Sequence, residues 1–462
     1  MTSVNRGRLR DMRGRVNMRA LAEHSRDLMR RSKEALLLAA VVGAVTGLGV
    51  AGFDSGVTRG VDAMNSLPLW ATAIAPLLGL SLAAATLHFV GRDASPATAD
   101  EYLHAFHDPE YKLTLRPLFA RMIAGIATLG SGAPMGLEGP SLYLGASVGD
   151  MLQQRFPRLF SAQRRRLLLV AGAGAGVAAI FKTPATGAVF ALEVPYQDDL
   201  ARYMLGPALI GSASSYLVFV AIHGTSPLLA VTGSPPFSFK DLTAAILLGI
   251  FAGVGARAFA WLLRRAKEVV TSVPVWIRVP AAGVSLAGMF VAARLLAGQN
   301  LTTGPGYDTI RWALEPTHSV WLIGAILLLR CFATSATIAG GGVGGLFIPL
   351  VVAGALAGRM VGGTINALDT SLFTVIGVAA FLGAGYRVPL AAVMFVAEAT
   401  GRPGFVVPGL LAAVVAELMM GRRSVTTYQQ TELTESAPRG ALPGGDGVGE
   451  TAVGESPPNG EP

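Results

Sequence analysis

The chain has 462 residues, of which 52% are hydrophobic and only 14% are charged, and its mean hydropathy is +0.52. An ordinary soluble domain carries about a quarter charged residues, so this composition excludes a soluble globular protein. The formal net charge is +8, and the single cysteine, Cys331, excludes a disulfide framework and a Cys-rich metal site.

Residues 1–33 form a basic, partly amphipathic arm with ten Arg and Lys side chains. Basic residues that flank membrane spans mark the cytoplasmic side, and the basic pair at 422–423 lies near the other end. We therefore expect both termini in the cytoplasm. The arm accounts for topology and for attraction to anionic lipid headgroups. Nucleic acid is not expected as a partner, because no nucleic-acid fold signature accompanies the arm. The arm is also too charged for a cleavable signal peptide.

Residues 34–430 are predicted to form one continuous transmembrane domain. Several apolar blocks approach the roughly 20 residues that cross the hydrocarbon: 35–52, 67–90, 242–263 and the block that begins at 319. Others are short or broken by Gly and Pro: 115–128, 141–152, 166–181, 185–194, 346–359, 372–382 and 388–399. Broken helices are tolerated only where the backbone faces protein or a water-lined cavity. The expected fold is therefore an all-α polytopic membrane protein with broken helices, followed by a disordered tail at 431–462.

A motif in the first half returns in the second. Gly136–Pro140, with the sequence Gly-Leu-Glu-Gly-Pro, is matched by Gly345–Pro349, with the sequence Gly-Leu-Phe-Ile-Pro, at an offset of 345 − 136 = 209. A second pair of blocks, Pro184–Glu193 and Pro389–Glu398, has an offset of 389 − 184 = 205. Internal repeats in a membrane protein are typical of transporters whose binding site lies at the repeat interface. Inverted halves are therefore predicted, at about 34–220 and 240–430.

The repeated motif has the chemistry of an anion site. Proline is favoured at the first position of a helix, so Pro140 and Pro349 are predicted to start helices. Each helix N-terminus carries about half a positive charge, and the free N–H groups at 137–139 and 346–348 are anion receptors. If the two N-termini converge, they form an anion site at membrane depth without a full positive charge. Binding there is weak enough for release.

Glu138 is the charged residue of this motif. A carboxylate at membrane depth costs roughly 3 kcal/mol or more, which makes it a functional candidate. At a helix N-terminus it is expected to occupy the place of the anion, and its protonation or displacement would open that place. The alternative is a glutamate that only caps the helix.

With these motifs the chain resembles the CLC family of chloride channels and proton–chloride antiporters, in the bacterial form without a C-terminal regulatory domain. Gly136–Pro140 resembles the family's Gly-[Lys/Arg]-Glu-Gly-Pro, and Gly345–Pro349 resembles its Gly-x-Phe-x-Pro. The two blocks of the second repeat match as well, and the resemblance covers about residues 34–428.

The resemblance implies a homodimer in which each subunit has its own pore and a pair of inverted halves. It implies that the backbone amides of Leu346 and Phe347 bind the anion, with Gly139 beside them, and that Glu138 is the gate. The implied partners are chloride or another small anion and the lipid bilayer, and no cofactor is implied.

Two departures from the family pattern affect the two entrances to the anion site. Leu137 takes the place of the basic residue before the gating glutamate, which makes the outer entrance less positive. The family's Gly-Ser-Gly-Ile-Pro-Glu should lie near 93–101, where this chain reads Asp-Ala-Ser-Pro-Ala-Thr-Ala-Asp-Glu. Ser95 or the amides of 96–98 are the candidates to replace it. These changes leave the preferred anion open.

Two further departures concern coupling to protons. Family antiporters commonly carry a second glutamate directly after the residue that matches Glu193, and here that position is Val194. The family's pore tyrosine falls on Thr426, with Tyr428 two residues on, and either hydroxyl is a candidate ligand. Val194 favours passive conduction, although Glu193 is close enough to substitute through water. Glu193 and Glu398 are more simply explained by pairing with backbone or hydroxyl groups.

The leading hypothesis is a plasma-membrane chloride pore gated by Glu138, similar to voltage-gated chloride channels. The alternatives are a proton-coupled chloride antiporter and a fluoride exporter of the same family. An enzyme is not expected, because no His-Glu-x-x-His, paired catalytic Asp or activated nucleophile is present. A membrane-anchored interaction protein that uses the basic arm is the third hypothesis. Lys182 either attracts anions or snorkels to the interface. The histidines show no metal-ligand spacing.

Overall fold

A computed structural model describes residues 18–108, 110–156, 166–197, 199–229, 238–365 and 370–430. Most of the predicted arm and the whole of the predicted tail lie outside these residues. Within them, regular structure is helical, and pairing of the sheet type is confined to two isolated bridges. The predicted all-α class is confirmed.

The same order of helices occurs twice. The first set is α2 (Met18–Asn65), α3 (Leu69–Ala85), α4 (Ala99–His107), α5 (Leu115–Gly130), α6 (Glu138–Arg155), α7 (Leu167–Phe181), α8 (Pro184–Glu193) and α9 (Leu205–His223). The second set is α10 (Phe239–Ser272), α11 (Val275–Ala297), α12 (Tyr307–Leu314), α13 (Val320–Ala339), α14 (Phe347–Thr364), α15 (Thr370–Tyr386), α16 (Pro389–Thr400) and α17 (Val406–Met420). A short π-helix, Thr86–Val90, follows α3, and 3-10 turns at Arg202–Met204 and Pro403–Phe405 precede α9 and α17.

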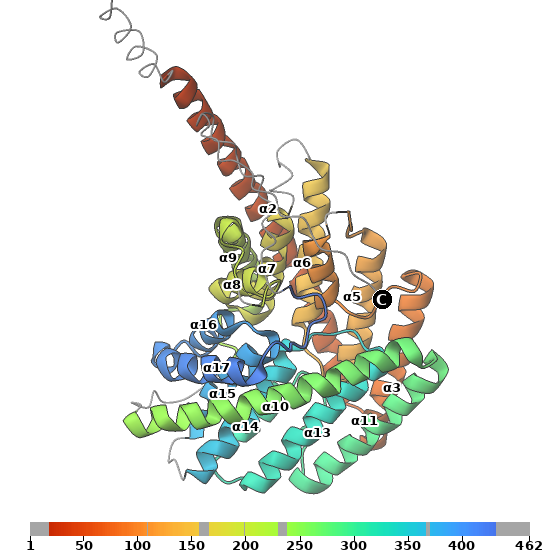
Figure 1. The fold of residues 1–462 in the computed structure, drawn as a ribbon. Coiled ribbons are helices and arrows are strands. Elements are labelled where there is room, and N and C mark those ends of the chain that lie inside the picture. Colours follow the sequence, from red (N-terminus) through yellow and green to blue (C-terminus); the bar gives the residue numbers. More distant parts are fainter. Residues whose placement is uncertain are drawn as a thin grey trace, which may run out of the picture.

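The two sets are related by inversion. Gly136 and Gly345 are equivalent in the repeat, and they form an antiparallel bridge with each other. Two equivalent residues pair reciprocally only next to a local two-fold axis, which reverses the direction of one half relative to the other. In Figure 1 the helices of the first half (red to yellow-green) and of the second half (green to blue) form two groups that meet at the centre. The predicted inverted-repeat architecture is confirmed.

Matched pairs of glycines hold helices closely together in both halves. A Cβ atom at Gly145 or Gly172 would collide with the backbone carbonyl of the other glycine, and Gly354 and Gly377 have the same relationship. The first pair joins α6 to α7, and the second joins α14 to α15. Small residues permit this approach where apolar burial does not drive association. The close packing positions the N-termini of α6 and α14 at the centre of the protein.

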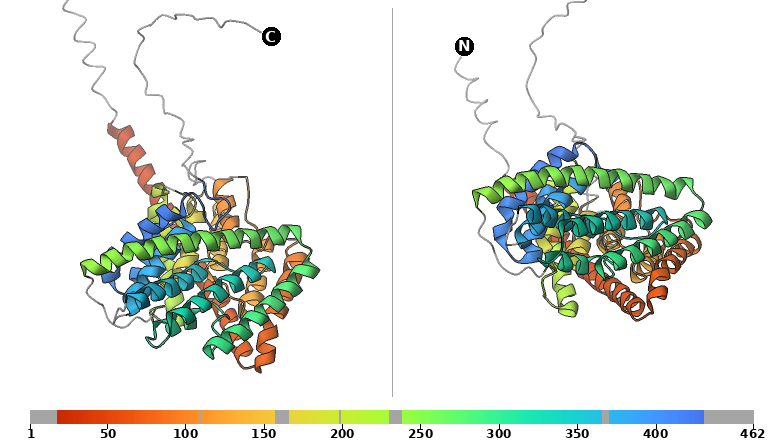
Figure 2. Two further views of the ribbon diagram at one scale, coloured as in Figure 1. Left: turned by 60° about the horizontal axis from the view of Figure 1, so that its bottom comes forward. Right: turned by 90° about the horizontal axis from the view of Figure 1, so that it is seen from below.

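Eight helices in the described part of the chain are long and apolar enough to cross a membrane. Their surfaces expose large apolar side chains, among them Leu37 (67%), Trp276 (76%) and Trp321 (90%). Monomeric soluble proteins rarely expose such surfaces. This is a multi-pass membrane protein. Figure 2 shows α10 across one side of it, and α3 packs side by side with α11.

Two segments differ in length from the sequence-based expectation. Helix α2 begins at Met18, inside the predicted arm, and continues to Asn65, so residue 33 is not a helix boundary. The segment 346–359 was predicted to be too short to cross, which is wrong, since α14 has 18 residues and ends at Thr364. The additional turn packs against α15, where Gly362 lies directly on the Phe373 side chain.

Candidate anion site

The N-termini of α6 and α14 meet, as the repeat predicts. The Gly136 N–H donates to the Gly345 carbonyl at 2.9 Å, and the Gly345 N–H donates to the Gly136 carbonyl at 2.7 Å. The helices begin at Glu138 and Phe347. Each motif proline is therefore the third helical residue, and the expectation that the prolines occupy the first position is wrong. Proline is tolerated at the third position because the N–H groups of the first turn have no acceptor within the helix.

The Glu138 carboxylate lies where these helix ends meet. The side chain is 2% exposed, and its Oε1 accepts a hydrogen bond from the Phe347 backbone N–H at 2.6 Å. In the part of the chain that the structure describes, Oε2 has no hydrogen-bond partner. Phe347 is the repeat equivalent of Glu138 (347 − 138 = 209). The carboxylate thus occupies the position in which the α14 amides would receive an anion.

The motif glycines form the cradle of this carboxylate. A Cβ atom at Gly136 would collide with Oε2 of Glu138, and one at Gly345 would collide with Oε1. A Cβ atom at Gly139 would lie 2.5 Å from the Thr98 hydroxyl and 2.8 Å from the Gly344 carbonyl. Glycine is therefore required at these three positions by lack of space for a side chain.

The electrostatics of the site come from backbone dipoles. No Lys or Arg in the described residues forms a salt bridge with Glu138. A buried carboxylate without an ion pair is costly, and here the α14 N-terminus offsets part of that cost through its amide and its partial positive charge.

Four aromatic side chains surround Phe347. Its ring centroid lies 4.5 Å from Phe181, 5.4 Å from Phe190, 4.9 Å from Phe395 and 6.5 Å from Tyr386. The rings fix the start of α14 and keep bulk water away from the amide that Glu138 holds. An anion bound there would have to shed water.

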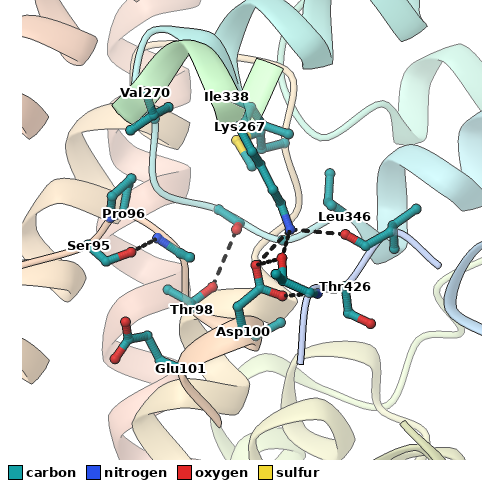
Figure 3. Close-up of a pocket in the computed structure, with 18 of the residues that line it drawn as sticks. Ser95, Pro96, Thr98, Asp100, Glu101, Lys267, Val270, Ile338, Leu346 and Thr426 are labelled. Carbon is teal, nitrogen blue, oxygen red and sulfur yellow. Dashed lines mark hydrogen bonds and ion pairs between the residues drawn. The ribbon is translucent and has the colours of Figure 1, made fainter. Parts of the chain in front are cut away.

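A cavity of about 360 Å³ adjoins the site. It is lined by the start of α4, the end of α10, the glycine-rich loop before α14, the end of α15 and the segment 425–428 (Figure 3). Four predicted site residues line it, namely Ser95, Leu346, Thr426 and Tyr428. Thr98, whose amide was a candidate, also lines it, as do three residues that were not site candidates, namely Asp100, Lys267 and Tyr386. Glu138 does not line the cavity, and its carboxylate lies against Gly345, which does.

Lys267 supplies an ammonium group to the cavity wall. Its Nζ lies 2.6 Å from Oδ2 of Asp100 and donates to the Val425 carbonyl at 3.0 Å. Asp100 also accepts the Thr427 backbone N–H at 3.0 Å. Figure 3 shows this network between α4, α10 and the C-terminal segment. It ties α4, α10 and the C-terminal segment together at the cavity wall, and the Asp100 carboxylate balances the charge of the Lys267 ammonium.

Thr98 lies nearer than Ser95 to the meeting point of the helices. The Thr98 hydroxyl donates to the Gly344 carbonyl at 3.4 Å. The Ser95 hydroxyl instead accepts the Ala97 N–H at 3.2 Å, which uses it within its own loop. Ser95 still lines the cavity, so the structure places both hydroxyls on the same wall.

A tyrosine that the sequence analysis did not identify occupies the inner side of the site. Tyr386 is 2% exposed, and the Leu346 N–H lies within hydrogen-bonding reach of its hydroxyl. Thr426 is engaged with the Ser424 hydroxyl at 2.9 Å, and the Tyr428 ring stacks on His104 at 5.0 Å and is 47% exposed. The repeat could have identified Tyr386 as a buried aromatic residue, because at the offset of 205 it is equivalent to Phe181, which lies in the core.

Glu193 and Val194 lie away from this cavity. Both are buried, and the Glu193 carboxylate accepts the N–H groups of Leu390 and Ala391 at 3.1 and 2.9 Å. This is the backbone pairing expected from the sequence. Lys182 donates to the His223 and Ser226 carbonyls at 3.5 and 3.3 Å, also outside the cavity.

Comparison with known proteins gives the family. An H(+)/Cl(−) exchange transporter ClcA of Citrobacter koseri is 27% identical over 87% of this chain and 90% of its own. A protein of Ralstonia nicotianae, whose name places it with ClcB-like chloride channels, is 28% identical over 79% of this chain and 85% of its own.

Solved structures share the fold. A CLC-type fluoride/proton antiporter superposes with a TM-score of 0.74 at 22% identity, over 87% of this chain and 98% of its own. A slow cyanobacterial Cl−/H+ antiporter superposes with a TM-score of 0.72 at 23% identity, over 84% of this chain and 94% of its own. Residues 79–421 match the family described as Voltage gated chloride channel, and the chain therefore belongs to this family, the CLC family of anion channels and transporters.

Proposed function

We propose that this protein is a proton-coupled chloride antiporter in which Glu138 is the gate. The family transports anions across membranes. The proposal that transport is coupled to protons through Glu138 rests on one observation. The Glu138 carboxylate occupies the anion seat at the start of α14 through the Phe347 amide. A side chain that competes with the anion for one amide, and that is neutralised by a proton, links the two ions at a single position.

Two candidates remain for the mode of transport. Val194 in place of a second glutamate favoured passive conduction, and that apolar residue is 1% exposed. The relatives named H(+)/Cl(−) exchange transporters support coupling instead, because they match 86–87% of this chain. We prefer exchange on this ground, and passive conduction becomes the second candidate.

A proton route that avoids Val194 is part of the proposal. Tyr386 lines the cavity, and its ring centroid lies 6.5 Å from that of Phe347, whose backbone N–H donates to Glu138. Asp100 lines the same cavity as Tyr386. Water in that cavity would carry protons from the inner side past Asp100 to the Tyr386 hydroxyl and on to Glu138. Glu193 is not part of this route, because it does not line the cavity.

The exchange cycle then follows from the site. A proton neutralises Glu138 and weakens its hydrogen bond to Phe347, because hydrogen bonds to a charged acceptor are the stronger ones. The carboxyl leaves, and chloride takes the amides of Leu346, Phe347 and the next residue. Chloride reaches the seat through the inner cavity, past the Lys267 ammonium.

The test is proton uptake into sealed vesicles that contain the purified protein and an outward chloride gradient. Exchange predicts uphill proton uptake at a fixed ratio to chloride efflux. Chloride efflux without proton movement would make the passive channel correct. Efflux compared with chloride, nitrate and fluoride in one preparation decides the anion, and a preference for fluoride would establish the fluoride-exporter alternative.

Assembly and topology follow the family resemblance. We propose a homodimer in the plasma membrane with both termini in the cytoplasm. Exposed apolar residues on α9 and α17, such as Leu217 (63%) and Leu418 (76%), supply a surface for a second subunit. The mass of the protein in detergent, measured by light scattering, checks the dimer. Protease access in oriented vesicles checks the termini.

A further inference from the structure

A second cavity, of about 880 Å³, lies beside the inner cavity. It is enclosed by the end of α3 and its π-helical extension, the loop before α4, the end of α10 and the start of α11. Apolar residues form most of its wall, among them Leu87, Phe89, Val275, Trp276 and Val279. Nothing in the proposed transport cycle uses this space.

Arg278 places a positive charge in this cavity without a matching anion. Its guanidinium packs directly on Gly341, whose φ of +83° and lack of a side chain make the approach possible. The Nε and Nη1 atoms are buried, and neither has a hydrogen-bond partner in the described residues. Buried donors are normally satisfied, and an arginine presents its donors in a fork that matches phosphate and carboxylate oxygens.

The carboxylate in the cavity lining does not supply the missing partner. Asp93 lies at the rim and pairs with Nδ1 of His88 at 2.6 Å. Both side chains are largely exposed, at 79% and 60%. The buried end of the cavity is therefore positive, and its rim is a solvated pair.

The cavity mouth is apolar and aromatic. Phe89 (73% exposed), Trp276 (76%) and Val275 (48%) surround it. Aromatic side chains of this kind gather at the level of lipid headgroups. The mouth adjoins the end of α10, which carries Arg264 and Arg265, and basic residues mark the cytoplasmic side. A ligand that fits has an anionic head for Arg278 and an apolar tail along the aromatic mouth.

We propose that this cavity binds an anionic phospholipid of the cytoplasmic leaflet, with the lipid phosphate on Arg278. Basic pockets between transmembrane helices on the cytoplasmic side suit acidic headgroups. The volume accommodates a headgroup and the first part of an acyl chain, while the rest of the lipid stays in the bilayer.

The bound lipid also acts on transport, a consequence that rests on the proposed function. Ser95, Pro96, Val270 and Thr271 line both cavities. Gly341, under Arg278, begins the loop that leads to the Gly345 bridge at the anion site. A phosphate that fixes Arg278 stiffens this shared wall and holds the inner cavity open, so anion flux rises with the fraction of anionic lipid.

Binding is tested apart from transport by quenching of Trp276 fluorescence. The purified full chain is placed in nanodiscs of phosphatidylcholine that contain a small fraction of brominated phosphatidylglycerol or brominated phosphatidylcholine. Wild type should show greater quenching by the anionic lipid, and Trp276→Phe should remove that excess. Arg278→Gln should also remove it, Arg278→Lys should retain part of it, and Arg265→Gln should leave it intact.

Arg265 is the matched control because it carries the same charge on the same side, is 63% exposed and lies outside the cavity. An undiminished excess in Arg278→Gln would overturn the proposal. A second outcome would also overturn it. If brominated phosphatidylglycerol quenches wild type no more than brominated phosphatidylcholine does, while inorganic phosphate raises the thermal midpoint of the protein, the site binds a soluble anion and not a lipid.

Flux is the second readout. Chloride efflux from wild type should rise at least twofold between vesicles of phosphatidylcholine and vesicles with added phosphatidylglycerol. Arg278→Gln should keep the lower rate in both, and Arg265→Gln should respond like wild type. A lipid response that persists in Arg278→Gln contradicts the coupling. Failure of all flux would contradict the proposed function, whereas the quenching result would still decide the lipid site.

Discussion

Glu193 and Glu398 cap each other's helices. Glu193, at the end of α8, accepts the first free N–H groups of α16, from Leu390 and Ala391. Glu398, near the end of α16, accepts the Ala185 N–H at 3.0 Å and the Thr186 N–H at 2.7 Å at the start of α8. The two short helices thus form a closed pair, in which each supplies the anion that the other's N-terminus requires.

Removal of either cap should lower the stability of the protein. Glu398→Ala leaves two backbone donors and the Thr186 hydroxyl without their acceptor, at a cost of about 1–3 kcal/mol. Glu193→Ala should cost a similar amount. The measurement is the thermal or denaturant midpoint in detergent. Glu268→Ala, which removes an exposed carboxylate on α10, is the control and should change stability by less than about 0.5 kcal/mol. Equal midpoints for all three variants would contradict the capping role.

Glu138→Gln should remove the pH dependence of chloride flux. In wild type, a fall in pH protonates the carboxylate and frees the Phe347 amide, so flux rises as pH falls. The amide of Gln cannot ionise and binds that N–H more weakly, by about 1–2 kcal/mol, which corresponds to roughly tenfold in occupancy. Flux should therefore be high and flat from acid to neutral pH, with no proton uptake. Wild-type flux with a wild-type pH response in the variant would exclude Glu138 as the gate.

Gly345→Ala should damage the site, whereas Gly288→Ala should not. An added Cβ at Gly345 meets the Glu138 carboxylate and the Gly139 backbone N, at 2.5 Å for the latter. Overpacking of this kind costs about 1–3 kcal/mol, and the displaced carboxylate should raise leak flux or abolish flux. Gly288 lies on the exposed face of α11 with open space around it, so alanine there should be neutral or slightly stabilising. Flux and midpoint are measured for both, and equal effects would count against the cradle.

Tyr386→Phe should alter selectivity between chloride and nitrate, and Tyr428→Phe should not. The Tyr386 hydroxyl is the buried one beside the Leu346 amide, while Tyr428 is stacked on His104 at the cavity edge. Loss of one donor to an anion corresponds to about 1 kcal/mol, or roughly a fivefold change in the ratio of the two fluxes. If Tyr428→Phe changes the chloride-to-nitrate flux ratio more than Tyr386→Phe does, the anion-binding hydroxyl comes from the C-terminal segment and not from Tyr386.

The sequence predicted that the starts of α6 and α14 meet at the site, because the repeated motif contains glycine and proline, whose backbone preferences are restrictive. Glycine and proline at fixed spacing specify where α6 and α14 begin, and the offset of 209 brings them together. The hydroxyls were harder to assign. Ser95 and Thr98 lie three residues apart in a loop, and only the course of that loop determines that Thr98 reaches Gly344.

The partners from other segments were not predictable from local sequence. Lys267 and Asp100 are 167 residues apart, and their ion pair depends on how the end of α10 meets the start of α4. Tyr386 was not predicted because the family resemblance placed the pore tyrosine at Thr426, 40 residues further along the chain. The length of α14 was underestimated because the predicted segment ended at the charged residue Arg359, which the structure buries within the helix.

The bond between Glu138 and Phe347 joins a residue to its own counterpart in the other half. The first half contains Glu138 and the second half contains Phe347, so neither half alone can form this hydrogen bond. The bridge between Gly136 and Gly345 likewise needs both halves, in inverted orientation. Either half alone would therefore lack the partner strand of backbone that completes the site. The two halves differ at the equivalent position, where one carries the Glu138 carboxylate and the other carries the Phe347 ring. The side chains of the site are thus asymmetric, although the two glycine motifs pair reciprocally through their backbones.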